Sequence, residues 1–208
     1  MYRESEWRST APANGDSGAG LAEAFLRIIS VLKGVGRICD LGCGNGYLAG
    51  QLAAMKYDVT GLDASQSGIQ IARLTHSSPR FICAELDRAL EENAGSEKFD
   101  LVIASDVIEH LYRPADLLEA AFGLAKPKGH ILIGTPYHGY LKNLALSMTG
   151  KMDAHFCALD DGGHIKFFSV KTLSTLVRAH GFHELTFSFY GRCPWLWKNM
   201  ICHARKRN

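Results

Sequence analysis

The stretch that decides the fold is I-C-D-L-G-C-G-N-G-Y, residues 38–47, where an apolar run leads into three glycines set two positions apart. Glycine adopts backbone conformations that other residues avoid, and it lets a ligand or another segment approach closely. A turn of this kind between a strand and a helix can cradle a nucleotide phosphate, hold an uncharged ligand, or make a tight corner and nothing more. The glycines alone leave all three interpretations open.

The chain around this turn alternates between short apolar runs and amphipathic helical patterns. The expected strands cover residues 37–41, 58–62, 80–83, 99–104 and 130–134, and the expected helices cover residues 18–33, 47–55, 67–76 and 114–125. Strands that alternate with helices predict a parallel sheet with crossover helices, because parallel neighbours cannot be joined by a hairpin. A further helix at 170–180 precedes two β-like runs, 183–190 and 195–203, which are joined so briefly that they must pair antiparallel. The predicted fold is an open α/β sheet that ends in an antiparallel hairpin.

The length and composition indicate one globular domain. The chain has 208 residues, of which 47% are hydrophobic, and this is enough for a single core. Residues 1–18 are polar and predict a flexible arm, and residues 19–208 are expected to form the domain. Within it, residues 137–168 exceed an ordinary connection, which indicates a lid or a substrate-binding element.

The charge pattern argues against a nucleic-acid partner. The formal net charge is +2, from 23 basic and 21 acidic residues, and no basic face is visible apart from a cluster at 205–207. The sequence also contains no apolar run long enough to span a bilayer, and its first residues do not resemble a signal peptide. We therefore expect a cytoplasmic location.

The acids around the turn indicate which ligand it holds. Asp40 precedes the first glycine, and the glycines read G-x-G-x-G instead of the dinucleotide fingerprint G-x-G-x-x-G. A carboxylate there would repel a pyrophosphate and would suit an ammonium or a sulfonium. Asp63 ends the second expected strand, where a carboxylate can accept both hydroxyls of a ribose. Glu85 and the backbone N–H of Leu86 follow the third strand and could read an adenine. An adenosine with a cationic tail and no phosphate describes S-adenosyl-L-methionine.

Four motifs now give the chain a family resemblance. They are D-L-G-C-G-N-G-Y (40–47), G-L-D-A-S (61–65), F-D-L-V-I-A-S-D-V-I-E-H-L (99–111) and L-A-K-P-K-G-H-I-L-I-G-T-P (124–136). In this order and spacing, over about residues 35–136, the chain resembles the class I S-adenosylmethionine-dependent methyltransferases. The resemblance implies a Rossmann-like, seven-stranded, mostly parallel sheet with helices on both faces and an antiparallel last strand.

The same resemblance implies which residues hold the cofactor. It places Asp40, Gly42 and Gly44 along the methionine part, Asp63 at the ribose, Ala64, Glu85 and Leu86 around the adenine, and Ala104 and Ser105 beside the amino-acid part. The expected cofactor is thus S-adenosyl-L-methionine, held by residues from four strand ends.

Candidate groups for the chemistry follow the fourth strand. Asp106, Glu109 and His110 lie at i, i+3 and i+4, which would place them on one face of a helical turn. Such a set can hold a divalent metal, provide a base, or simply shape the end of a helix. The run resembles that of small-molecule O-methyltransferases of the ubiquinone-biosynthesis type, where it is associated with metal-assisted activation of a catechol hydroxyl. His164 is a second candidate for the catalytic site, because in an extended segment it shares a face with Lys166.

We therefore expect an enzyme that moves a methyl group to a small organic acceptor, most readily to a hydroxyl oxygen. Transfer to nitrogen or carbon, and a non-catalytic module that binds the cofactor, are the alternatives. An NAD oxidoreductase is disfavoured by Asp40 and by the glycine spacing, and a nucleic-acid or protein methyltransferase lacks its expected features. Trp7 and Tyr2 are expected in an N-terminal flap over the cofactor.

The insertion raises a further question about the acceptor. Its apolar residues are Tyr140, Leu141, Leu144, Leu146 and Met148. They indicate an apolar or lipid-linked acceptor or, alternatively, a helix face packed on the sheet. With the basic C-terminal cluster, they leave peripheral membrane contact as an expectation to be tested.

Overall fold

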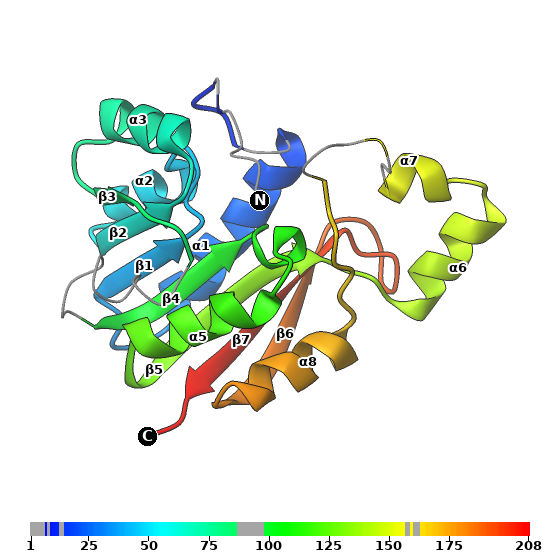
Figure 1. The fold of residues 1–208 in the computed structure, drawn as a ribbon. Helices are drawn as coiled ribbons and strands as arrows, with labels where there is room; N and C mark the ends of the chain where they lie inside the picture. Colours follow the sequence, from blue (N-terminus) through cyan, green and yellow to red (C-terminus); the bar gives the residue numbers. More distant parts are fainter. Residues whose placement is uncertain (1–6, 8, 13–14, 87–97, 157–158, 160–162) are drawn as a thin grey trace.

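A single seven-stranded sheet organises the molecule (Figure 1). The computed structural model describes residues 7, 9–12, 15–86, 98–156, 159 and 163–208. The strands are β1 (Arg37–Leu41), β2 (Asp58–Asp63), β3 (Arg80–Cys83), β4 (Phe99–Ser105), β5 (Ala125–Pro136), β6 (Phe182–Tyr190) and β7 (Asn199–Lys206). Their order is β3-β2-β1-β4-β5-β7-β6, and β7 runs antiparallel to both of its neighbours while the remaining pairs are parallel. The expected fold class is confirmed.

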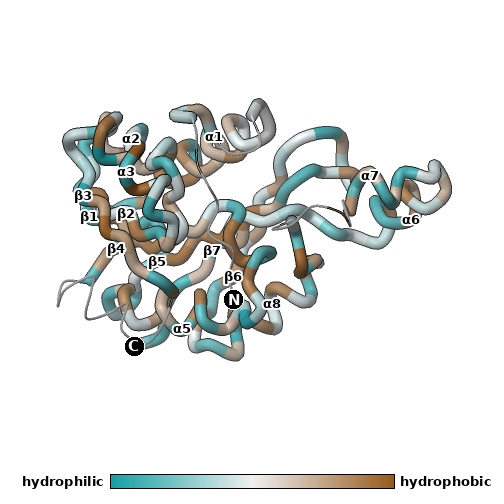
Figure 2. The backbone as a smooth tube through the Cα atoms, turned by 45° about the horizontal axis from the view of Figure 1, so that its top comes forward, coloured by the Kyte–Doolittle hydropathy of each residue, from teal (hydrophilic) through white to brown (hydrophobic). Residues whose placement is uncertain are grey.

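Helices cover both faces of this sheet. They are α1 (Asp16–Val31), α2 (Tyr47–Ala54), α3 (Gln66–Thr75), the 3₁₀ turn η1 (Ile108–His110), α5 (Pro114–Leu124), α6 (Tyr140–Met148), α7 (Met152–Phe156) and α8 (Val170–Ala179). α1, α2 and α3 pack on one face, and α5 and α8 pack on the other (Figures 1 and 2). Each face has its own apolar core, so the central strands are buried on both sides, as parallel sheets require.

Three elements begin two or more residues away from their expected starts. α1 begins at Asp16, so the last residues of the predicted arm are helical. β5 begins at Ala125 and not at residue 130, because Ala125 pairs with Phe99 across an irregularity in the ladder. β7 begins at Asn199 and not at Trp195, whose backbone φ of 69° lies in the left-handed region and takes it out of the extended strand.

The insertion between β5 and α8 stands apart from the sheet (Figure 1). α6 and α7 project beyond the strand ends, and the chain returns along residues 163–168 to α8, whose start is fixed by a capping box between Ser169 and Thr172. The ammonium of Lys142 is buried at the base of α6 and donates a 2.7 Å hydrogen bond to the carbonyl of Tyr137. Among the described helices, none is long and apolar enough to cross a membrane.

Candidate active site

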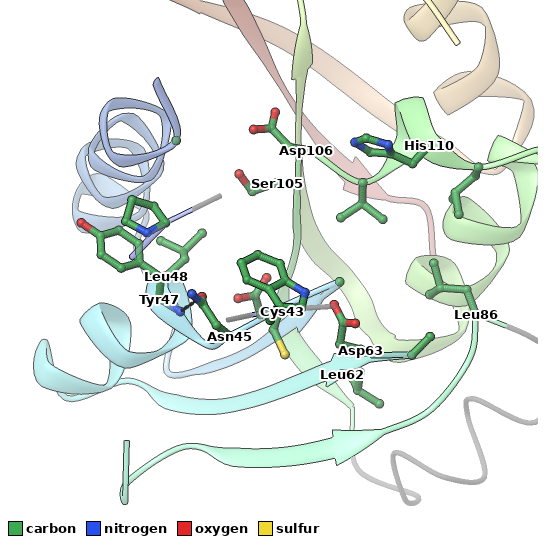
Figure 3. A pocket seen from close by; sticks show the side chains of 18 of the residues that line it. Cys43, Asn45, Tyr47, Leu48, Leu62, Asp63, Leu86, Ser105, Asp106 and His110 are labelled. Carbon is green, nitrogen blue, oxygen red and sulfur yellow. Dashed lines mark hydrogen bonds between the residues drawn. The ribbon is translucent and has the colours of Figure 1, made fainter. Parts of the chain in front are cut away.

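A cavity of about 920 Å³ opens at the carboxyl ends of the parallel strands. Figure 3 shows the side chains of Asp63, Ser105 and His110 around it, from the ends of β2 and β4 and from η1. Ligands of open α/β sheets bind at this edge, beside the point where the strand order reverses. β1 and β4 are hydrogen-bonded neighbours here, although β2 and β3 come between them in sequence.

The glycine turn needs glycine for both conformation and space. Gly42, Gly44 and Gly46 have positive φ angles of 75°, 51° and 78°. A Cβ added at Gly42 would lie 2.4 Å from a methyl carbon of Val107, and one at Gly44 would lie 2.3 Å from the ring of Trp7. Side chains at these positions would therefore be strained and would clash.

Asp63 ties the tips of two strands together. One carboxylate oxygen accepts a 2.8 Å hydrogen bond from the N–H of Gly44, and the other accepts a 2.7 Å bond from Ser65. The backbone N–H of Gly42 also donates to the carbonyl of Leu62, at 2.7 Å. Asp63 also lines the cavity, where its carboxylate faces a ligand.

Asp40 is the most perturbed acid at this end of the cavity. It lies at the tip of β1 and is almost completely buried. Burial, with a smaller contribution from the negative charge of Asp63, raises the pKa of Asp40 to about 7. A carboxylate that is costly to ionise by itself is stabilised by a cation placed beside it.

Most of the residues expected to hold a cofactor meet in this one cavity. Those that line it are Asp40, Gly42, Asp63, Ala64, Glu85, Leu86 and Ser105. Gly44 does not line it, because the ring of Trp7 covers that glycine. Ala104 is buried within β4, where its side chain belongs to the core and not to the cavity wall. Trp7 lines the cavity as expected of a flap, whereas Tyr2 lies outside the described residues.

The predicted helical face of Asp106, Glu109 and His110 is wrong. Asp106 has a φ of 54°, and η1 begins only at Ile108, so the three do not share one helical turn. Asp106 and His110 line the cavity, whereas Glu109 turns into the core and has no exposed surface. Its Oε2 accepts a 3.0 Å hydrogen bond from Thr135 on β5. Burial, with the negative charge of Asp106, raises the pKa of Glu109 well above its usual range.

His164 joins this group from the returning segment. Its ring packs edge-on against that of His110, with centroids 4.9 Å apart, and its Nε2 lies 3.9 Å from Oε1 of Glu109. The backbone N–H groups of Ile165 and Lys166 both donate to the carbonyl of Glu109, at 2.9 Å. One ligand atom from each of Glu109, His110 and His164 lies within 4.8 Å of the other two. Among the described residues, the possible metal ligands thus include His164 in place of Asp106.

Residues that were not predicted line the end of the cavity around His110 and His164. His155 and Phe156 enter from α7, and Tyr112 and Arg113 follow η1. His138 is buried next to this group, with its ring 5.3 Å from that of His155. No spacing in the sequence relates His155 to η1, and the only signal was that the insertion resembled a lid.

A protein-family model supports the interpretation of the strand-end motifs. Residues 14–186 match the model described as a methyltransferase domain. The match includes β1 to β5, the insertion and most of β6.

Curated relatives share about half of this region. The chain is 38% identical over 101 residues to a ubiquinone biosynthesis O-methyltransferase of Alkalilimnicola ehrlichii. The aligned residues make up 48% of this chain and 41% of the relative. It is 31% identical over 128 residues to an enzyme of the same name from Bradyrhizobium diazoefficiens. This alignment makes up 62% of this chain and 50% of the relative. The chain spans about half the length of the curated relatives it matches.

Solved structures share the fold at low identity. The N-methyltransferase NodS of Bradyrhizobium japonicum, in complex with S-adenosyl-l-homocysteine, is 14% identical, with a TM-score of 0.68 over 94% of this chain and 90% of that one. The magnesium protoporphyrin IX methyltransferase of Synechocystis is 19% identical, with a TM-score of 0.65 over 90% of this chain and 84% of that one.

Proposed function

The chain belongs to the methyltransferase-domain family, and from this premise we propose that it transfers the methyl group of S-adenosyl-L-methionine to a hydroxyl oxygen of a small organic acceptor. The observation that carries the proposal is one cavity with two buried or half-buried acids, Asp40 and Asp63, at one end and two histidines, His110 and His164, at the other. The relatives named as O-methyltransferases favour oxygen over nitrogen or carbon as the acceptor atom.

The residues at the first end fit the cofactor in charge and in space. Asp40 and Asp63 offer carboxylates to a cationic tail and a ribose, and Gly42 leaves room for the side chain of Val107 at the cavity wall. Glu85 and Leu86 also line the cavity, and we assign them to the edge of the adenine. S-adenosylmethionine, when bound, supplies a methyl group on a positively charged sulfur. The chain contributes alignment, because displacement requires the acceptor oxygen in line with the bond that breaks.

The residues at the second end support removal of the acceptor proton. His110 lines the cavity and contacts His164, so either imidazole can take a proton from a hydroxyl placed between η1 and the returning segment. The edge-on packing and the buried Glu109 hold these rings in place. His155 and Phe156 enclose the same end from α7, where an aromatic or other flat acceptor would contact them.

A divalent metal is the alternative to a histidine base in this proposal, because an imidazole that binds a metal through its basic nitrogen cannot also accept the proton of the hydroxyl. The residues fit in two ways: Glu109, His110 and His164 bring their ligand atoms together, and the buried Oε1 of Glu109 has no hydrogen-bond donor among the described residues. Two imidazoles and one carboxylate suit a transition metal such as Zn²⁺ or Mn²⁺ better than Mg²⁺. If the metal is used, a chelator will abolish turnover and leave the affinity for the cofactor nearly unchanged. Full turnover in excess chelator would exclude the metal.

The exposed face of α6 supports peripheral membrane contact. Tyr140, Leu141, Leu144 and Met148 are exposed there, and only Leu146 of the apolar set is buried. If this face docks on lipid, replacing Leu144 and Met148 by serine will reduce co-sedimentation with anionic vesicles without lowering thermal stability. Equal recovery of wild type and variant with the vesicles would exclude this face as the contact.

The main test is transfer of a labelled methyl group. Protein incubated with methyl-labelled S-adenosylmethionine and a panel of phenols, catechols and amines should label a hydroxyl compound, and His110→Ala should lose this transfer while binding the cofactor. Tight cofactor binding without transfer to any acceptor would favour a non-catalytic module. Retention of NAD and not of S-adenosylmethionine in calorimetry would overturn the assignment altogether.

A further inference from the structure

A short N-terminal segment crosses the end of the cavity that holds Asp40 and Asp63. We call this part the cofactor end, and the part around His110 and His164 the acceptor end. We call residues 7 and 9–12 the N-terminal strap. The backbone N–H of Trp7 donates a 3.0 Å hydrogen bond to the hydroxyl of Ser67, at the start of α3. The indole lies directly on the glycine turn, where a Cβ at Gly44 would approach it to 2.3 Å. Trp7, Ser9, Ala11 and Pro12 all line the same cavity as Asp40 and Asp63.

Asn45 fastens this strap to the glycine turn. The side chain is 2% exposed, and its amide nitrogen donates to the carbonyl of Ser9 at 2.8 Å and to that of Ala11 at 2.6 Å. Its amide oxygen accepts from the backbone N–H of Tyr47 at 3.3 Å. A primary amide has two N–H donors, and both are used here on the strap. Neither an aspartate nor an alanine could make these two bonds.

We propose that Trp7 is a further cofactor-binding residue and that Asn45 is the residue that positions it. The inference rests on the proposed function, because it concerns the ligand of the same cavity. A nucleoside held by Asp63 shares the cavity with the indole, whose face attracts both a flat base and a positively charged group. A positioning role explains why both N–H donors of the buried Asn45 amide bind an N-terminal segment.

A consequence concerns the rate at which the ligand leaves. Because the strap packs on the glycine turn and lines the cavity, we expect it to hold a bound ligand in place. Loss of either Trp7 or the two bonds from Asn45 should therefore speed dissociation more than it slows association.

The test is a double-mutant cycle on S-adenosylhomocysteine binding, measured by calorimetry on the full chain. Trp7→Ala and Asn45→Ala are each expected to bind about ten-fold more weakly. If Asn45 acts by positioning Trp7, the double variant will bind no more than about two-fold more weakly than Trp7→Ala alone. The matched control is Trp195→Ala, in the connection between β6 and β7, which is 61% exposed and does not line the cavity. It should bind within about two-fold of wild type.

Fluorescence gives a second measurement that does not depend on Asn45→Ala folding. The chain has three tryptophans, so in the Trp195→Phe, Trp197→Phe variant the emission comes from Trp7. S-adenosylhomocysteine should change this emission with the same dissociation constant as calorimetry. No change, wild-type affinity of Trp7→Ala, or multiplicative losses in the double variant would each overturn the inference. Failure of wild-type protein to bind S-adenosylhomocysteine would instead overturn the proposed function.

Discussion

The two ends of the cavity are built from different kinds of contact. At the cofactor end, the tips of β1 and β2 are parallel neighbours, with Leu41 paired to Leu62, and Asp63 links them through backbone N–H groups. At the acceptor end, around His110 and His164, the cavity is lined by η1, by α7 and by the segment 163–168, and the last two lie more than forty residues further along the chain. The N–H groups of Ile165 and Lys166 bind that segment to the carbonyl of Glu109.

We expect this difference to let mutations change the affinity for the cofactor and the turnover of the reaction separately. The cofactor end is part of the sheet, so its geometry is fixed by the ladders that also hold the core together. The acceptor end depends on a few hydrogen bonds to an insertion that projects from the body (Figure 1). We expect changes at the first end to alter cofactor binding and stability together, and changes at the second end to alter the reaction with binding preserved.

The largest expected effect is on turnover at the acceptor end. His110→Ala should lower kcat by roughly 100- to 10,000-fold, because general-base catalysis contributes factors of this size. The affinity for S-adenosylhomocysteine should stay within about two-fold of wild type, since the ring of His110 packs against that of His164 at the acceptor end. Steady-state kinetics and calorimetry on one preparation would measure both.

His180→Ala is the matched control for this change. His180 ends α8, where its ring bonds to the carbonyl of Leu176, and it does not line the cavity. Its kcat should remain close to that of wild type. An equal loss of cofactor affinity and of kcat in His110→Ala would break the separation between the two ends.

The cofactor end could be predicted from the sequence because its determinants are local. Asp40 and the glycines lie within seven residues, Asp63 follows a recognisable strand, and parallel strands bring their carboxyl ends to one edge by topology alone. What local patterns could not show is that Trp7 would cover Gly44, since that contact joins positions 37 residues apart with α1 and β1 between them.

The acceptor end was predicted less well because hydrophobic periodicity predicts helices and strands but not the contacts that irregular segments make. The spacing of Asp106, Glu109 and His110 assumed a helix, but the left-handed residue Asp106 breaks it and sends Glu109 into the core. His155 lines the cavity from α7, more than forty residues beyond η1, and no sequence pattern relates the two positions.

A second prediction concerns the stability of the insertion. Burial, followed by the charges of Lys142 and His155, lowers the pKa of His138 from its ordinary value to about 4. Between pH 6.5 and 4 the unfolded chain binds a proton that the folded chain does not, so stability falls as the pH falls through this window. His138→Phe should remove about 2 kcal/mol of the fall in unfolding free energy between pH 7 and pH 4.5. Denaturant unfolding of both proteins at pH 7 and pH 4.5 measures it, and identical pH profiles would contradict the assignment.

At the cofactor end, Asp40→Asn should change affinity and stability together, in opposite directions. Affinity for S-adenosylmethionine should fall roughly 100-fold, because a buried charge pair is lost. Stability without ligand should rise at pH 8, by on the order of 2–4 kcal/mol, since the folded chain no longer contains a carboxylate that is costly to ionise. Calorimetry and thermal unfolding test the two effects. Asp58→Asn, at the exposed start of β2, is the control and should change neither by much.

The smallest expected effect is the pH dependence of cofactor binding. With a pKa of about 7, Asp40 is mostly protonated at pH 6 and mostly ionised at pH 7.5. Only the ionised form attracts a cation, so the affinity for S-adenosylmethionine should rise about eight-fold across this interval. The α-amino group of the ligand stays largely charged there, because its ordinary pKa is about 7.7–8.0. Asp40→Asn should show a nearly flat profile. If Asp40→Asn kept the wild-type dependence of affinity on pH, the titrating group would lie elsewhere in the cavity. Asp63, and not Asp40, would then be the acid that attracts the cation at the cofactor end.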